Sequence, residues 1–340
     1  MNREFNMLSG SKKEAIQTKI DQDQFSGVVY VTKLGRSVLS LSAGFADREH
    51  QIPNKIDTKF NLGSNNKMFT AVSIAQLAQA GRLHFQDPIG KYLTDYPNPE
   101  VRAVTIHQLL THTGGTGDIF GPQFDVHLVE LKEPNDFIRL YGQRGLAFLP
   151  GSHFAYSNYG FILLGAIIER VSGQIYYDYI RQHIYKSASM TSSESYWKME
   201  HIPNRAIGYI RSPDQGALQS NFEHLPMRGT PTGGGYSTAE DLAHFATALQ
   251  SHQLLNAEYT DIVTTGKVDT PDHQKYAYGF RDRTEKDLHW IGHSGGGPGV
   301  NTTLRIYPDL GYVIIVLSNL DYPAADNVAE FIQLLGLNDA

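Results

Sequence analysis

The sequence contains no cysteine among its 340 residues, which excludes disulfide bonds, a cysteine nucleophile and thiolate metal sites. No apolar run reaches the roughly 18 residues of a transmembrane helix, so no membrane span is expected. The opening residues Met1–Met7 lack the apolar stretch of a signal peptide. We therefore expect a cytoplasmic protein, with export after removal of a signal segment as the alternative.

The lack of a basic cluster and of a metal-binding motif argues against two other classes of protein. The net charge of −6 comes without a basic cluster, which argues against a nucleic-acid partner. The 14 histidines are scattered and no H-E-x-x-H motif occurs, so we expect no metal and no cofactor. With 41% hydrophobic residues, the chain can bury one large core or two close-packed lobes.

One serine–lysine pair is distinguished by its context. The pattern S-x-x-K occurs at Ser9–Lys12, Ser64–Lys67 and Ser195–Lys198. Only the second opens a run, residues 68–80, that is apolar on nearly every side and predicts a buried helix ending at Gly81. The other two lie in polar or Ser/Thr-rich stretches, so Ser64 and Lys67 are the candidates for chemistry.

This spacing suits nucleophilic catalysis. Ser64 would lie at the positive end of the helix, with Lys67 one turn further on the same face. Burial lowers the pKa of a lysine, and a neutral amine can take the proton of a serine hydroxyl. The alternative is an ordinary N-cap serine followed by a lysine whose stem lies along the surface.

A tyrosine motif lies before a second apolar helix. Tyr156-Ser157-Asn158 follows the turn signal Pro150-Gly151-Ser152 and precedes the apolar residues 161–168. Loops that lead into a rigid core element often carry site residues. The other Y-x-N match, Tyr96-Pro97-Asn98, lies in a proline-rich turn with no apolar helix directly after it.

The third motif fits two patterns. Gly292–Gly296 matches G-x-S-x-G, the nucleophile elbow of α/β-hydrolases, with Ser294 as nucleophile. That interpretation needs a later histidine and a following helix, but no histidine follows His293 and strand-like runs come next. We therefore place His293 and Gly295 at the end of a strand in an antiparallel meander. The other H-x-G match, His112-Thr113-Gly114, is expected to form a structural turn.

Together, Ser64–Lys67, Tyr156–Asn158 and His293–Gly295 resemble the motifs of the serine β-lactamase and penicillin-binding-protein superfamily. Tyrosine in the second motif is typical of the branch with class C β-lactamases, D-alanyl-D-alanine carboxypeptidases, D-aminopeptidases and family VIII esterases. The resemblance covers roughly residues 15–335. It implies a serine hydrolase that works through a covalent acyl-enzyme and needs no cofactor.

The resemblance also implies roles for the catalytic residues. Ser64 is the nucleophile, and Lys67 and Tyr156 exchange its proton, with the identity of the general base left open. Asn158 orients Lys67 and the substrate. The backbone N–H groups of Ser64 and Gly296 are implied to hold the oxyanion.

The strand side of the site is assigned to His293, Gly295 and Gly296, and His293 is implied to assist Tyr156. Class C β-lactamases usually carry lysine at the position of His293, and histidine is only partly protonated at neutral pH. A substrate carboxylate is then attracted less. We therefore expect a carboxylesterase acting on a small ester, amide or short peptide. A D-amino-acid-specific peptidase, a DD-carboxypeptidase or a weak β-lactamase is the alternative; a catalytically silent penicillin-binding-like sensor and a metallohydrolase are other classes.

The order of elements predicts an α+β fold of the β-lactamase/transpeptidase-like type. We expect helices at 12–22 and 326–335 and strands at 27–33, 37–44, 301–307 and 312–318. Strands at both chain ends predict one antiparallel sheet flanked by helices, with an inserted, mostly helical lobe. We place the α/β lobe at about 1–62 and 262–340 and the helical lobe at about 63–261 of a single catalytic domain, 1–340. Residues 185–230 are expected to form a long loop beside the cleft.

Overall fold

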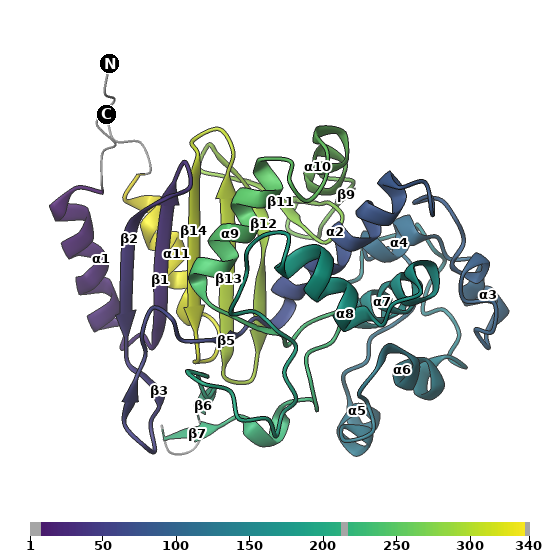
Figure 1. Ribbon diagram of the computed structural model, residues 1–340, viewed down its shortest axis with the longest axis horizontal. Coiled ribbons are helices and arrows are strands. Elements are labelled where there is room, and N and C mark those ends of the chain that lie inside the picture. Colours follow the sequence, from purple (N-terminus) through teal and green to yellow (C-terminus); the bar gives the residue numbers. More distant parts are fainter. Residues whose placement is uncertain (1–7, 212–216, 337–340) are drawn as a thin grey trace.

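The computed structural model describes residues 8–211 and 217–336. Its main strands are β1 (Gly27–Lys33), β2 (Arg36–Ala43), β9 (Val268–Asp269), β10 (Lys275–Tyr276), β11 (Arg281–Glu285), β12 (Leu288–Gly297), β13 (Val300–Tyr307) and β14 (Tyr312–Ser318). They form one antiparallel sheet in the order β2-β1-β14-β13-β12-β11-β10-β9 (Figure 1). The expectations for Met1–Met7 and for 212–216 of the long loop lie outside the described residues.

The helices are α1 (Gly10–Gln22), α2 (Asn66–Gln79), α3 (Pro99–Arg102), α4 (Ile106–Leu110), α5 (Pro122–His127), α6 (Pro134–Tyr141), α7 (Asn158–Ser172), α8 (Tyr176–Ile180), α9 (Ala239–Gln250), α10 (Ala257–Thr264) and α11 (Ala324–Leu334). The shorter turns are the 3₁₀ turns η1 (Gly63–Asn65), η2 (Ile89–Lys91) and η4 (Phe222–His224) and the π turn η3 (Arg181–Tyr185). Three small ribbons pair β3 (Phe45–Asp47) with β4 (Ile52–Pro53), β5 (Phe60–Asn61) with β8 (Tyr236–Ser237), and β6 (Tyr209–Arg211) with β7 (Leu218–Ser220). No helix among the described residues is both long and apolar enough to span a bilayer.

The sheet joins the two ends of the chain, as the sequence predicted. β1 pairs with β14 along its whole length, from Gly27 opposite Ser318 to Lys33 opposite Tyr312. The predicted terminal helices correspond to α1 and α11, and the predicted strands are found within one residue of their expected bounds. The β-lactamase/transpeptidase-like fold class is therefore confirmed.

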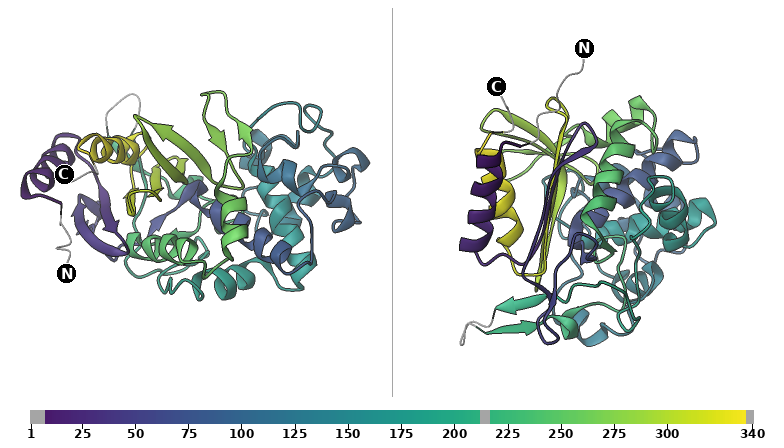
Figure 2. Two further views of the ribbon diagram at one scale, coloured as in Figure 1. Left: turned by 90° about the horizontal axis from the view of Figure 1, so that it is seen from above. Right: turned by 60° about the vertical axis from the view of Figure 1, so that its left-hand side comes forward.

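Helices cover both faces of the sheet (Figure 2). In β1 the side chains alternate between two apolar cores, because successive residues of a strand point to opposite faces. Val29 packs with α1 and α11, whereas Val28 packs in the larger core with α2, α7 and α9. The helices α2 to α8 extend beyond the end of the sheet (Figure 1). The site lies where this helical part meets β12.

The start of α2 is pinned to β12 and β13 by close backbone contact. The Thr302 hydroxyl donates to the Leu62 carbonyl at 2.8 Å and accepts from the Asn65 side chain at 2.8 Å. Gly295 lies opposite the same segment, and a Cβ added there would come within 2.0 Å of the Leu62 carbonyl oxygen. Only glycine permits this approach, so residue 295 sets how closely η1 can lie against the sheet.

Gly295→Ala should therefore destabilise the fold. Overpacking a close contact costs about 1–3 kcal/mol, and here the clash is with backbone. The matched control is Gly297→Ala, because a Cβ at Gly297 meets no atom within 4 Å. Urea unfolding should show a lower midpoint for Gly295→Ala than for Gly297→Ala; equal midpoints would contradict this account of the packing.

Candidate active site

Lys67 is a fully buried ionisable side chain at the centre of the site. It occupies the first turn of α2, is 0% exposed, and lies in a helix whose residues are buried on nearly all sides. Its Nζ lies 3.0 Å from Ser64 Oγ, 2.8 Å from Asn158 Oδ1 and 2.8 Å from the Thr232 carbonyl oxygen. The predicted proximity of Ser64 and Lys67 is confirmed, although Ser64 lies in η1 rather than in α2 itself.

The three contacts of Lys67 suit a neutral amine. The Thr232 carbonyl can only accept a hydrogen bond, and Asn158 presents its oxygen because its Nδ2 donates to Asp118 Oδ2 at 3.1 Å. Asn158 Oδ1 also accepts from the Thr232 hydroxyl at 2.7 Å. A neutral amine has two N–H bonds and one lone pair. Both N–H bonds are then taken, and the lone pair faces the Ser64 hydroxyl.

Burial separates the proton affinities of the two candidate bases. It lowers the pKa of Lys67 well below its ordinary value; Asp118 opposes the shift and Arg281 adds to it. Burial raises the pKa of Tyr156, and a hydrogen bond with Ser64 opposes that shift. The Lys67 Nζ lies 4.8 Å from the centre of the Tyr156 ring. The arrangement therefore favours a neutral Lys67 and a protonated Tyr156.

The glycines of the third motif lie against the serine. Gly63 has a φ of +49° and lies close to Gly296. A Cβ added to Gly63 would be only 3.0 Å from the Gly296 backbone nitrogen. Ser64, Gly295 and Gly296 line one cavity together. β11 begins at Arg281, opposite Gly292, so residues 293–297 of β12 have no β11 partner and present their edge beside Ser64.

His293 does not have the environment that the sequence suggested. We expected it to line the strand side with a partly charged ring. Its side chain is instead 0% exposed, pointing into the protein, and lines neither cavity beside Ser64. Burial, together with the charge of Arg281, lowers the pKa of His293 well below its ordinary value. A neutral ring is therefore favoured, and we expect no pH-dependent attraction between His293 and a substrate carboxylate.

Sequence reasoning missed several residues that surround the site. Asp118 accepts from the backbone N–H and the side chain of Asn158, each at 3.1 Å. Thr232 holds Lys67, and its place in the run Pro231–Gly235, which is rich in glycine, was the only local signal for it. Tyr276 and Arg281 belong to β10 and β11 and carry no motif. Their position depends on strand pairing, which a single sequence does not reveal.

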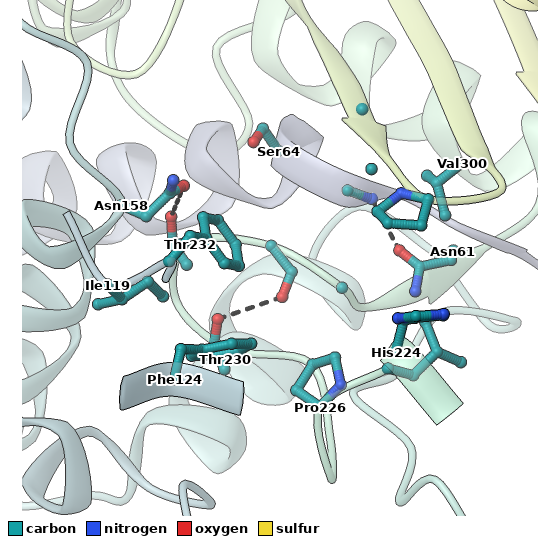
Figure 3. Close-up of a pocket in the computed structure, with 18 of the residues that line it drawn as sticks. Asn61, Ser64, Ile119, Phe124, Asn158, His224, Pro226, Thr230, Thr232 and Val300 are labelled. Carbon is teal, nitrogen blue, oxygen red and sulfur yellow. Dashed lines mark hydrogen bonds between the residues drawn. The ribbon is translucent and has the colours of Figure 1, made fainter. Parts of the chain in front are cut away.

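An apolar pocket of about 250 Å³ opens on one side of Ser64. Figure 3 shows Ser64 at its rim, with Phe124 from α5 and Val300 from β13 facing the same space. Residues with apolar side chains dominate the wall: Ile119, Phe120, Phe124, Phe137, Leu225, Pro226 and Val300. His224 and Thr230 also line it, together with Leu225 and Pro226, so the end of the predicted 185–230 loop does border the site.

A polar trough of about 550 Å³ opens on the other side of Ser64. It runs over one face of β11 to β13 and is lined by three arginines and four carboxylates: Arg281, Arg283, Arg305, Asp272, Glu285, Asp326 and Glu330. Ser64, Tyr156 and Gly296 line both the polar trough and the apolar pocket. A molecule bound at Ser64 can therefore extend into two spaces of opposite polarity.

Comparison with known proteins agrees with this geometry. The family model described as Beta-lactamase matches residues 13–337. A penicillin-binding protein of Bacillus subtilis (strain 168) is 29% identical over 336 residues, covering 92% of this chain and 73% of that protein. The structure of a penicillin-binding protein from Bacillus halodurans superposes with a TM-score of 0.87 at 34% identity, covering 94% of this chain and 99% of that one. A D-amino acid amidase from Ochrobactrum anthropi SV3 shares the fold, with a TM-score of 0.83 at 19% identity and coverage of 97% and 99%.

The chain belongs to the Beta-lactamase family. Within it, the relatives and the fold place the chain with the serine β-lactamases and penicillin-binding proteins, in the class C-like branch. It is a serine hydrolase of that superfamily, which answers the question of enzyme or silent sensor that the sequence left open.

Ser64→Ala should abolish turnover, with a loss on the order of 10³-fold or more, because nucleophilic catalysis disappears. A fluorophosphonate probe should add one mass increment to the peptide that contains Ser64 and none to the variant. Ser294→Ala is the matched control, since Ser294 is the nucleophile of the competing G-x-S-x-G interpretation. An inactive Ser294→Ala enzyme beside an active Ser64→Ala enzyme would reverse the assignment.

The acid limb of the pH profile should report Lys67. If neutral Lys67 is the active form, kcat/KM falls as the pH drops through the lowered pKa of Lys67. Asp118 raises that pKa, so Asp118→Asn should move the acid limb to lower pH, whatever it does to the maximal rate. Asp95→Asn, which removes only an exposed partner of Arg170, should leave the limb in place. A limb that moves to higher pH in Asp118→Asn would show that neutral Lys67 is not the titrating species.

Proposed function

We propose that this enzyme hydrolyses a small peptide-like substrate whose leaving group ends in a carboxylate, in the manner of a D-amino-acid-specific peptidase. In this proposal the acyl group occupies the apolar pocket and the leaving group lies in the polar trough. The scissile carbonyl is held at Ser64, where the two spaces meet. The expectation of a carboxylesterase rested on weak charge at His293, and the buried ring indeed offers no charge to a carboxylate. The proposal assigns the carboxylate to Arg281 in the polar trough instead.

The observation that carries the proposal is the state of Arg281. Within residues 8–211 and 217–336, Arg283 pairs with Asp272 at 2.6 Å, and Arg305 lies 3.7 Å from Asp326 and 3.8 Å from Glu285. Arg281 has no ion-pair or side-chain hydrogen-bond partner in the same described residues, and its Nε is buried without one. A cation left unpaired beside a nucleophile favours a ligand that brings the missing carboxylate.

Acylation in this scheme begins with the lone pair of neutral Lys67. In the resting site, Ser64 Oγ lies 3.0 Å from Lys67 Nζ. Lys67 takes the proton of Ser64 as Oγ attacks the carbonyl. The developing oxyanion would be held by the N–H groups of Ser64 and Gly296. Protonated Tyr156, with its raised pKa, then donates to the leaving amine or alkoxide, and Lys67 returns the proton to Tyr156.

Deacylation reverses the same proton movements. The leaving group departs from the polar trough, and a water molecule takes its place beside Tyr156 and Lys67. Neutral Lys67 removes the proton of this water as it attacks the acyl-enzyme, and the proton returns to Ser64 Oγ when the acid is released. Asn158 and Thr232 keep their hydrogen bonds to the Lys67 amine throughout. The scheme therefore needs no further charged group.

A carboxylesterase is the second candidate. It is favoured by the apolar pocket of about 250 Å³, which suits a short acyl chain. A neutral alcohol leaving group would leave Arg281 unpaired. The two candidates therefore differ in one measurable property, the response to negative charge on the leaving group.

Two peptides that differ only in a free carboxylate or a carboxamide at the leaving end would test this. The wild type should prefer the carboxylate by about tenfold in kcat/KM, because a charge-assisted pair at a partly wet site contributes about 1.4 kcal/mol. Arg281→Met should remove the preference. Both D- and L-residues on the acyl side should be compared, since the proposal expects the D-series to be faster.

Arg283→Met is the matched control, because it removes a cation from the same trough that already has a carboxylate partner. It should keep most of the preference. A wild type that cleaves both peptides equally and cleaves neutral short-chain esters faster would instead establish the esterase. A preference that survives Arg281→Met would place the carboxylate at another residue.

A further inference from the structure

Three buried rings form a hydrogen-bonded chain behind the site. His112 follows α4, Tyr276 ends β10 and His293 lies in β12. His112 Nε2 is 3.0 Å from the Tyr276 hydroxyl, which is 3.0 Å from His293 Nε2. The three side chains are 1%, 2% and 0% exposed, respectively, so water does not reach the links from outside. The proton exchange described for Ser64 uses none of them.

The two ends of this chain determine where every proton lies. At one end the Ser157 backbone N–H, which can only donate, reaches His112 Nδ1 at 3.1 Å. At the other end the Ser294 carbonyl, which can only accept, lies 2.6 Å from His293 Nδ1. His112 must therefore carry its proton on Nε2 and donate it to Tyr276. Tyr276 then donates to His293 Nε2, and His293 carries its proton on Nδ1.

Every donor and acceptor in the chain is satisfied only while both histidines are neutral. A proton added to His112 would break its bond from Ser157. One added to His293 would leave the Tyr276 hydroxyl proton without its acceptor. The positive charge of Arg281 acts in the same sense, since it disfavours a further positive charge on either ring. Burial lowers the pKa of both histidines well below the ordinary value.

The backbone groups at the two ends belong to opposite sides of the site. Ser157 lies between Tyr156 and Asn158, and Ser294 directly precedes Gly295 and Gly296. The His112 ring also packs against the Tyr156 ring, with centres 4.2 Å apart. The hydrogen-bonded chain of rings thus connects the loop that carries Tyr156 to the edge of β12 that has no β11 partner.

We propose that His112, Tyr276 and His293 are positioning residues that fix the distance between Tyr156 and the β12 edge on either side of Ser64. The inference rests on the proposed role of Ser64 as nucleophile but not on the identity of the substrate. A displacement of about 1 Å between reacting groups can slow a reaction about 100-fold. A rigid neutral connection of this kind sets that geometry without adding charge beside Lys67.

The test is the rate at which an activated ester acylates Ser64. Tyr276→Phe keeps the ring but removes both links, so the acylation rate should fall about tenfold or more, with little change in KM. Tyr278→Phe is the matched control. Tyr278 is also a buried tyrosine, 4% exposed, and its hydroxyl bonds a histidine, His107, at 2.8 Å, but that pair is not part of the hydrogen-bonded chain beside Ser64. It should acylate like the wild type while losing a similar amount of thermal stability.

A second measurement observes the histidines of the wild-type protein directly. Nitrogen-15 NMR of histidine-labelled wild-type protein distinguishes the two neutral tautomers and the cation. His112 should be protonated on Nε2 and His293 on Nδ1, and neither should titrate between about pH 5.5 and 8, the range around the ordinary histidine pKa. The two signals can be assigned by their loss in His112→Gln and His293→Gln.

The outcomes separate this inference from the proposed function. Failure of the wild type to be acylated at Ser64 would overturn the proposed mechanism itself. Normal acylation of the wild type, with Tyr276→Phe as fast as Tyr278→Phe, would overturn only the positioning role. Reversed tautomers, or titration of either ring within that pH range, would also overturn it. Slow acylation in Tyr276→Phe together with the two derived tautomers would support it.

Discussion

The arrangement of the site depends on the removal of Lys67 from water. An ammonium group buried without a carboxylate in contact is strongly disfavoured, and the simplest relief is loss of its proton. The helix that carries Lys67 is buried almost all round, and the side chain itself is 0% exposed. The same burial that makes the residue costly to the fold makes it a base. Burial of Lys67 Nζ therefore lowers the stability of the fold while it increases the reactivity of the amine.

Neighbouring residues can be understood as a response to that constraint. Asp118 does not touch Lys67; it fixes the amide of Asn158 so that oxygen rather than nitrogen faces the amine. The Thr232 backbone carbonyl accepts a hydrogen bond from the amine at 2.8 Å. The nearby imidazoles stay uncharged. Each of these features preserves one orientation of the Lys67 lone pair.

The residues that sequence predicted well are those whose environment is local. Ser64 and Lys67 are one helical turn apart, and the apolar run after them shows the burial directly. Tyr156 and Asn158 are likewise placed by the helix that they precede. The sheet from both chain ends followed from alternating strands and turn residues. The lobe boundaries remain a prediction, since nothing in the structure or the relatives tests them.

Residues whose roles depend on distant pairing could not be predicted in the same way. Whether His293 faces the cleft or the core depends on the register of β12, and a shift of one residue would exchange the two. The sequence therefore placed His293 in the correct strand but did not reveal that its ring is fully buried. Arg281 lines the same cavity as Ser64 because β11 begins opposite Gly292. The point at which a strand begins is not marked by any sequence motif.

The sheet that unites the two chain ends has a consequence for how the enzyme is made. A ribosome completes Ser64, Lys67 and Tyr156 long before it reaches β12, and β1 waits for β14, whose first residue is Tyr312. The central sheet cannot close on a growing chain until β14 has emerged. Until then the helical part lacks the sheet that covers its apolar faces, and such faces are accessible to chaperones. The site is likewise assembled only after β12, which lines it beside Ser64, has joined the sheet.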